Sequence, residues 1–189
     1  MAFQVLPILA GLIVGWARKG SLWAIPRINL KLVWVLPISY LIQVVSIHDL
    51  NGISYQITLV VSYIGLLIFC GVNYRVPGVL WAMGGTAANF VVMLCNGLRM
   101  PAYIPAVEKM APQLVPLLIR GQYGKSIAMS DSTHLNFLGD IFYFKIPPQS
   151  LVSVGDILIA IGLVLFLQDA MRVERRVSSS GKHTSEMVK

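Results

Sequence analysis

Two aspartates, Asp140 and Asp156, are the residues of this sequence best suited to chemistry. Each follows a glycine, and both stand at the entrance to the last long apolar segment of the chain. A carboxylate at or inside an apolar segment is costly, so it usually faces a protein interior or a water-filled cavity. Two such carboxyl groups that converge can share a proton and act as acid and base. The sequence therefore predicts Asp140 and Asp156 as candidate catalytic residues.

Four further polar residues lie near the same ends of the apolar segments: Asn89, Asn96, Arg99 and His134. Asn89 falls inside an apolar segment, where its amide needs hydrogen-bond partners, either on a neighbouring helix or in a site. Arg99 follows a helix stop at Asn96, and we expect it to anchor the chain at a lipid headgroup, or to pair with an aspartate or an anionic substrate group. His134 with the two aspartates is a weak metal pattern, so we expect no metal and no cofactor.

The composition favours a membrane protein. Of the 189 residues, 56% are apolar and 12% are charged, and the mean hydropathy is +0.72; a soluble domain carries roughly 25% charged residues. The net charge of +7 is concentrated in short loops and the tail, as expected of topology signals and contacts to anionic lipid. We therefore expect membrane lipids as partners, and no nucleic acid.

Cys70 and Cys95 lie near opposite ends of neighbouring apolar runs, too far apart to bridge, and are expected to be small buried hydrophobes.

Five apolar runs predict transmembrane helices, at about 1–17, 32–47, 52–73, 77–97 and 151–169. A span needs about 20 residues, with a range of about 17 to 25, so the first two runs are short. The first run carries its basic residues after its apolar core, the reverse of a cleaved signal peptide, and we expect it to be retained. In that run, Gly11 and Gly15 have the spacing that lets another helix approach closely. The predicted fold is an all-α integral membrane protein with one helical domain, residues 1–171.

The basic residues predict the direction of these helices. Ten of the 15 lie in the first and third loops and in the tail, at Arg18, Lys19, Arg27, Lys31, Arg75, Arg172, Arg175, Arg176, Lys182 and Lys189. The other five lie in the long loop before the last apolar run, and long loops carry less weight in setting the orientation. The positive-inside rule then places the N-terminus outside and the C-terminus inside a bacterial inner membrane. The long loop 98–150 is outside, together with the candidate site, and the polar tail 172–189 is expected to be disordered in the cytoplasm.

The long outer loop is expected to cap the helices without forming a core of its own. Its segment Pro105–Ile119 carries Pro112 and Pro116, which predicts a short broken helix lying at the membrane interface. Residues 121–136 are rich in glycine and serine and are interpreted as a mobile loop. The aromatic run Ile141–Phe144 suits the lipid headgroup boundary.

Two segments resemble a known family. The run Met83–Asn89 (MGGTAAN) is similar to the glycine-glycine…asparagine signature of bacterial lipoprotein signal peptidase. Gly139–Phe142 with the later Pro147, and then Val152–Ile157, resemble the second half of that family, where one aspartate precedes an aromatic stretch and another opens the last helix.

The resemblance implies an aspartic hydrolase, signal peptidase II-like, that acts on a membrane-anchored substrate. Asp140 and Asp156 would match the catalytic aspartates, and Asn89 would match the supporting asparagine. The second to fifth predicted helices would reproduce the family's four-helix topology, with both ends inside and the dyad at the outer face.

A second resemblance covers most of the chain. The pattern of Asn-Gly-Leu-Arg-Met-Pro at 96–101, a later histidine, Leu-Gly-Asp at 138–140 and Gly-Asp at 155–156 is similar to a family of small bacterial multi-pass membrane proteins of unknown function. This resemblance implies an inner-membrane location and no particular activity.

Two other classes of function remain open at this point. One is a binding or sensing module, with a membrane pocket for a lipid, a quinone or a small ligand, in which the aspartates hold loop to helix through Arg99 or Lys145. The other is a structural subunit of a membrane assembly, bound to a partner membrane protein. Carboxyl groups within about 5 Å of each other favour the dyad, whereas a hydrogen bond that each one accepts from its own arginine or backbone amide argues against it.

Overall fold

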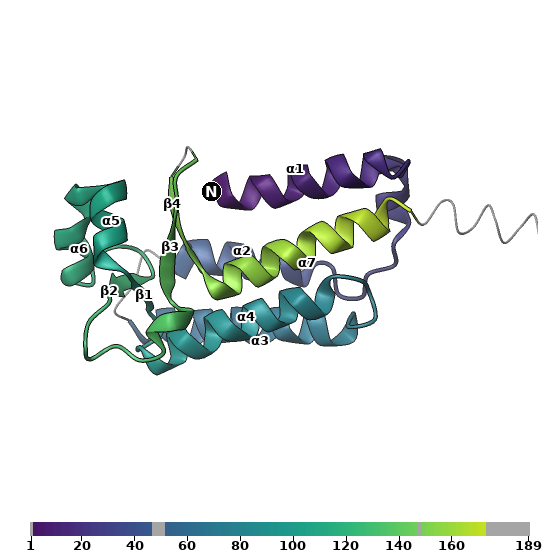
Figure 1. Cartoon of the computed structure of the whole chain (residues 1–189). Helices are drawn as coiled ribbons and strands as arrows, with labels where there is room; N and C mark the ends of the chain where they lie inside the picture. The colour runs from purple at the N-terminus through teal and green to yellow at the C-terminus, as the bar shows by residue number, and fades with distance from the viewer. Residues whose placement is uncertain (1, 47–51, 147–148, 173–189) are drawn as a thin grey trace, which may run out of the picture.

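The computed structural model describes residues 2–46, 52–146 and 149–172, and long helices make up most of it (Figure 1). The five long helices are α1 (Ala2–Ala17), α2 (Val35–Ser46), α3 (Ile53–Val72), α4 (Val79–Cys95) and α7 (Val154–Ala170). Each one begins and ends within a few residues of a predicted apolar helix. The tail is predicted to be disordered, but its residues from 173 onwards lie outside the described part of the chain.

Helix length bears directly on the predicted membrane crossings. Within the described ranges, α3 is the one helix both long and apolar enough to cross a membrane by length and composition. Val5–Ala17, Val35–Val45 and Val79–Cys95 are shorter apolar segments. One such helix is a weak indication, because the core helix of a soluble protein passes the same test. Five crossings and their orientation therefore stay predictions.

Glycines set the distance between α4 and α7, which run antiparallel. A Cβ atom at Gly85 would collide with the carbonyl oxygen of Gly155, and one at Gly162 would lie 2.5 Å from the carbonyl oxygen of Gly78. The two backbones therefore touch at both ends of the contact, with Ala82 between them. Contacts of this kind come from small residues, because any larger side chain would separate the helices.

Helix α7 also carries α1 on another side, so it lies between α1 and α4 (Figure 1). Gly11 faces Leu167, and Gly15 faces Met171 just after the end of α7. The close approach of a helix predicted from the spacing of these two glycines is thus confirmed, and the partner is α7.

One end of the bundle, here called the basic end, is formed by the loops after α1 and α3 and by the end of α7. The first loop contains the 3-10 helix η1 (Leu22–Arg27). Buried Asn73 joins this loop to α3, because its side chain exchanges hydrogen bonds with the backbone N–H and carbonyl of Lys31 at 2.9 and 2.8 Å.

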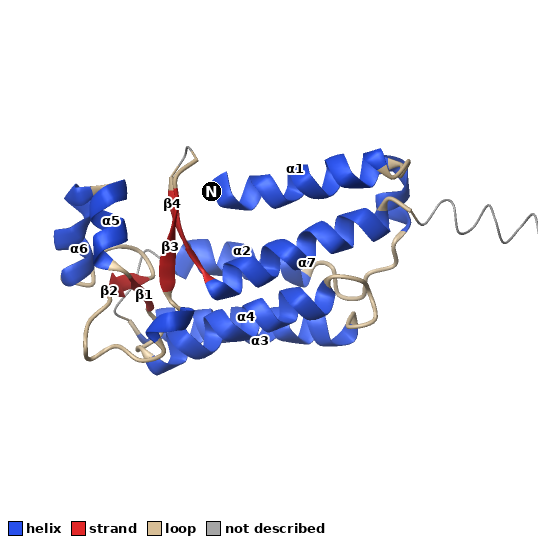
Figure 2. Cartoon of the chain, viewed as in Figure 1, coloured by secondary structure: helices blue, strands red, loops and turns tan. Residues whose placement is uncertain are grey.

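The opposite end carries a cap that includes a four-stranded sheet (Figure 2). The strands are β1 (Met100–Ala102), β2 (Ser126–Ala128), β3 (Asp140–Phe144) and β4 (Ser150–Ser153), in the order β2-β1-β3-β4. β1 runs parallel to β2 and β3, and β3 and β4 are antiparallel. The purely all-α prediction is wrong in this respect. The run Ile141–Phe144, which suits a lipid headgroup boundary by its aromatic character, also has the aromatic and β-branched composition that favours a strand, and it forms most of β3.

The cap also has a core, which corrects a second expectation. Ala102, Val107 and Leu118 are buried together, with Leu114, Val115, Ala128 and Leu151 packed against them. The predicted broken helix is confirmed as α5 (Ile104–Met110), the 3-10 turn η3 (Pro112–Leu114) and α6 (Val115–Ile119). Residues 121–136, interpreted as loop, contribute β2 and the start of the 3-10 turn η4 (Asn136–Leu138).

The glycine contact between α4 and α7 generates a prediction with a neighbouring control. Gly85→Ala places a methyl group against the backbone of α7 and should lower the free energy of unfolding by roughly 1–3 kcal/mol. Gly84→Ala meets no atom within 4 Å and should be neutral or stabilise by up to about 1 kcal/mol, because alanine favours helix. Thermal unfolding of the purified proteins in detergent compares them. A Gly85→Ala protein as stable as the Gly84→Ala protein would contradict this packing.

Candidate functional site: an acidic cluster where the cap meets the bundle

Three side chains form a closed hydrogen-bond network at the start of α7. Asn89 on α4 donates from Nδ2 to Asp156 Oδ1 at 3.0 Å, and its Oδ1 accepts from Ser153 Oγ at 2.8 Å. Ser153 Oγ in turn accepts the backbone N–H of Asp156 at 3.0 Å, and the Ser153 N–H donates to Asp156 Oδ2 at 3.1 Å. Ser153 and Asn89 are buried, so each polar group has a partner where water is scarce.

The local sequence explains this arrangement. Ser153 and Asp156 are the N-cap and N3 residues of α7 and form a reciprocal capping box, which satisfies two N–H groups that a helix start leaves open. Gly155 between them is required because a Cβ atom there would collide with Oδ1 of Asn89. The network therefore fixes both the start of α7 and its position on α4.

Asp140 lies beside this network on the neighbouring strand. It is paired with Ser153 in the β3–β4 ladder, next to a bulge between Asp140 and Phe142. In the part of the chain that the structure describes, the Asp140 side chain has no hydrogen bond or ion pair. Sheet bulges are frequent beside active sites, where they redirect a side chain.

Burial is the main cause that raises the pKa of Asp140, from 3.8 to about 7. The negative charge of Asp156 raises it further, and the nearby Lys125 opposes the shift. The two aspartates thus differ in their surroundings: Asp156 accepts hydrogen bonds from two N–H groups, whereas burial raises the pKa of Asp140 to about 7. A buried carboxyl group with this behaviour is a candidate for acid–base chemistry.

Lys125 is a cation within electrostatic reach of both carboxyl groups. Burial lowers the pKa of Lys125, and the charges of Asp156 and Asp140 oppose that change. Its Nζ donates to Oε1 of Gln43 at 2.8 Å, which joins the cap to α2. Sequence reasoning missed Lys125, a lone lysine in a polar segment. It also missed Ser153, although the Ser-x-x-Asp spacing was a usable capping signal.

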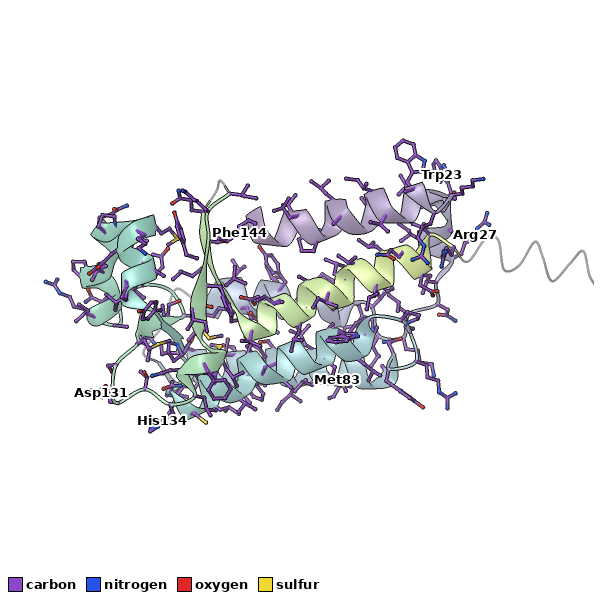
Figure 3. The ribbon with its side chains drawn as sticks, in the orientation of Figure 1. Trp23, Arg27, Met83, Asp131, His134 and Phe144 are labelled. Atoms are coloured by element: carbon purple, nitrogen blue, oxygen red, sulfur yellow. The ribbon has the colours of Figure 1, made fainter. Side chains whose placement is uncertain are left out.

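Asn96, Arg99 and His134 are engaged elsewhere and hold the cap to the helices. Asn96 donates to the carbonyl of His134 and accepts its N–H, both at 2.8 Å. The imidazole of His134 is exposed and points away from the bundle (Figure 3). Arg99 donates from Nη1 to the carbonyl of Gly121 at 2.7 Å and lies over the ring of Tyr55.

The predicted pairing of Arg99 with an aspartate is not found among the described residues. Of the six predicted site residues, Asn89 and Asp156 are joined by a hydrogen bond, and Asp140 lies on the strand that pairs with Ser153 of the same network. Within the described ranges, the structure has no group of three or more histidine, cysteine, aspartate or glutamate side chains that could hold a metal ion.

Fold and site together define a five-helix bundle with a small mixed sheet at one end and an acidic cluster where sheet and bundle meet. The chain belongs to a family of unknown function, DUF5317, whose model matches residues 27–168. The match includes all six predicted site residues and leaves out α1. No curated protein and no solved structure matches the chain.

The raised pKa of Asp140 predicts how stability depends on pH. The unfolded chain loses this proton near pH 3.8 and the folded protein near pH 7, so the folded state binds the extra proton between those values. The free energy of unfolding should therefore fall by roughly 2–4 kcal/mol as pH rises through this window. Asp140→Asn should remove that fall, matching the wild type at pH 4 and exceeding it at pH 8. Equal pH slopes in the two proteins would show that Asp140 ionises normally.

Proposed function

We propose that this chain is an integral membrane protein with a hydrolytic aspartate site at the cap end. The membrane placement is supported by the surface of the helices. On α3, Ile53, Ile57, Val61, Ile64 and Ile68 are each 46–75% exposed, and exposed apolar side chains also cover α1, α2 and α4. Soluble proteins rarely expose apolar patches of this extent.

The distribution of polar groups supports the same placement. Helices α1 to α4 contain no lysine, arginine, aspartate or glutamate, and polar side chains such as Ser39, Ser62 and Thr86 are turned inward. Arginines and lysines follow the helices at the basic end. The positive-inside rule then favours five crossings of a bacterial inner membrane, with the cap outside and the basic end in the cytoplasm.

This topology can be tested with two matched cysteine substitutions. In a background that lacks Cys70 and Cys95, Ser132→Cys places an exposed thiol on the cap, and Asn29→Cys places one at the basic end. A membrane-impermeant maleimide should label Ser132→Cys in intact spheroplasts, and Asn29→Cys after permeabilisation alone. Labelling in the reverse order would overturn the orientation, and loss of the protein from alkali-washed membranes would overturn the membrane placement itself.

One arrangement carries the proposed chemistry: Asp140, whose pKa burial raises to about 7, lies on the strand next to the capping network in which Asp156 accepts two hydrogen bonds. A protonated carboxylic acid next to a carboxylate is an acid and a base in one site. The two accepted hydrogen bonds use two of the roughly four lone-pair positions of the Asp156 carboxylate, which leaves room for a water molecule.

In the proposed reaction, Asp156 takes a proton from water as the water oxygen attacks the scissile carbonyl carbon. Asp140 donates its proton to the carbonyl oxygen. The tetrahedral intermediate then breaks the bond to the leaving group, which receives the proton held by Asp156. One hydroxyl of the intermediate returns its proton to Asp140 as the carbonyl group re-forms, so both aspartates regain their starting states. Asn89 orients Asp156 throughout, because its Nδ2 fixes one carboxylate oxygen. A substrate anchored in the membrane would bring its scissile bond to this end of the bundle.

Substitution of the aspartates tests this activity. Asp140→Asn and Asp156→Asn should each lower processing of membrane-anchored proteins by about a hundredfold or more, while Asp131→Asn, an exposed aspartate on the cap, should not. Mass spectrometry of membrane proteins from expressing cells would reveal the unprocessed forms. Wild-type activity should also fall as pH rises through about 7, where Asp140 loses its proton. Unchanged processing in both variants would exclude the hydrolase.

A second candidate function is a membrane ligand-binding or sensing module. It is favoured by the capping role of Asp156 and by an apolar hollow of about 210 Å³ in the bundle, to which Leu36, Phe69, Ile159 and Phe166 contribute. In that case the Asp156→Asn variant would lose thermal stability without any unprocessed protein accumulating.

A further inference from the structure

Three arginines from separate segments line one hollow at the basic end. Arg18 follows α1, Arg75 lies in the turn between α3 and α4, and Arg172 follows α7. The hollow has a volume of about 350 Å³. It lies at the end of the bundle opposite the acidic cluster, so the proposed reaction does not involve it.

Neighbouring side chains hold two of these arginines in place. Arg18 donates from Nη1 to Oε1 of Gln168 at 2.8 Å. Arg75 donates from Nε to the hydroxyl of Tyr74 at 2.8 Å, and its guanidinium lies 5.4 Å from the centre of that ring. A guanidinium has five N–H donors, so these single bonds orient each head and leave other donors for a ligand.

The charge of the hollow is positive. Asp169 is the acidic residue of its described lining, so three arginines against one aspartate leave an excess of two positive charges. The start of α4 also opens into the hollow, and no side chain caps it. A free helix N-terminus adds N–H donors and a partial positive charge, so an anion would relieve the repulsion among the arginines.

The hollow has an apolar side as well, formed by Leu80, Trp81 and Leu165. Leu165 also lines a second hollow of about 430 Å³ between α1 and α7. Apolar side chains of both helices, such as Leu6 and Ile161, line this second hollow. A positive hollow and an apolar hollow that share a wall suit a ligand with an anionic head and a hydrocarbon tail.

We propose that the basic hollow binds the phosphate group of an anionic phospholipid, with an acyl chain in the apolar hollow between α1 and α7. Arginine suits this role because its planar head binds two phosphate oxygens at once. Of the proposed function, this assignment requires the membrane placement. It does not require the acid–base chemistry at Asp140.

Binding can be measured on the purified full chain in detergent. The probes are phosphatidylglycerol, phosphatidylcholine with the same acyl chains, and inorganic phosphate, each titrated as a competitor of a fluorescent phosphatidylglycerol. The wild type should prefer phosphatidylglycerol over phosphatidylcholine by about tenfold or more, and added salt should reduce this preference. Inorganic phosphate should compete at far higher concentration, because it lacks the chain.

A charge-matched pair of triple variants locates the site. The combination Arg18→Gln, Arg75→Gln and Arg172→Gln should weaken phosphatidylglycerol binding by about tenfold or more. Removal of three exposed cap charges (Lys109→Gln, Arg120→Gln and Lys145→Gln) should change it by less than about twofold. Arg75 lies in a surface turn, so the single substitution Arg75→Gln should leave the fold unchanged. It should weaken phosphatidylglycerol binding by less than the triple substitution does.

Three results would overturn this assignment. Equal affinity of the wild type for the two lipids would remove the headgroup preference. Equal losses in the two triple variants would make the attraction a property of net charge. Competition by inorganic phosphate as strong as that by phosphatidylglycerol would identify a free phosphate site instead. None of these results would contradict the membrane placement, because cysteine labelling and alkali extraction test that placement separately.

Discussion

The close contact between α4 and α7 is the constraint on which the rest of the structure depends. Glycines allow the two backbones to touch, and the network of Asn89, Ser153 and Asp156 closes the contact at its cap end. Each part requires the other: without Gly155 the Asn89 amide would not fit, and without Asn89 the buried Ser153 hydroxyl would lack its acceptor. A satisfied polar network in a low-dielectric region also fixes one register of packing among several.

The same contact determines where the acidic cluster forms. Ser153 ends β4 and caps α7, so the residue that positions Asp156 also pairs with Asp140 across the sheet. The cap is therefore continuous with the last helix. Burial at this junction raises the pKa of Asp140 more than any single charge does, because desolvation is the largest cause of the shift.

Apolar runs and glycine spacing were sufficient to predict the five long helices and the close approach at Gly11 and Gly15, since both depend on local composition. The sheet was predictable in part: the composition of Ile141–Phe144 favours a strand, but β1 and β2 have three residues each and carry no clear periodicity. The pairing of β1 with β2 and β3, more than twenty positions away along the chain, has no local signal. Of the site residues, Asn89 and the two aspartates were recognisable as costly polar groups in apolar surroundings. Lys125 was not, because its burial comes from the folded cap and not from its sequence neighbours.

The position of α1 has a consequence for how the chain assembles. Of the described helices, α1 comes before the others along the chain, yet it packs chiefly on α7, which comes after them. The face that carries Gly11 and Gly15 therefore has no main partner until α7 emerges, while α2, α3 and α4 can already pack on one another. Completion of the bundle is a late, long-range step, and such steps are where assembly is slowest and most exposed to wrong pairings.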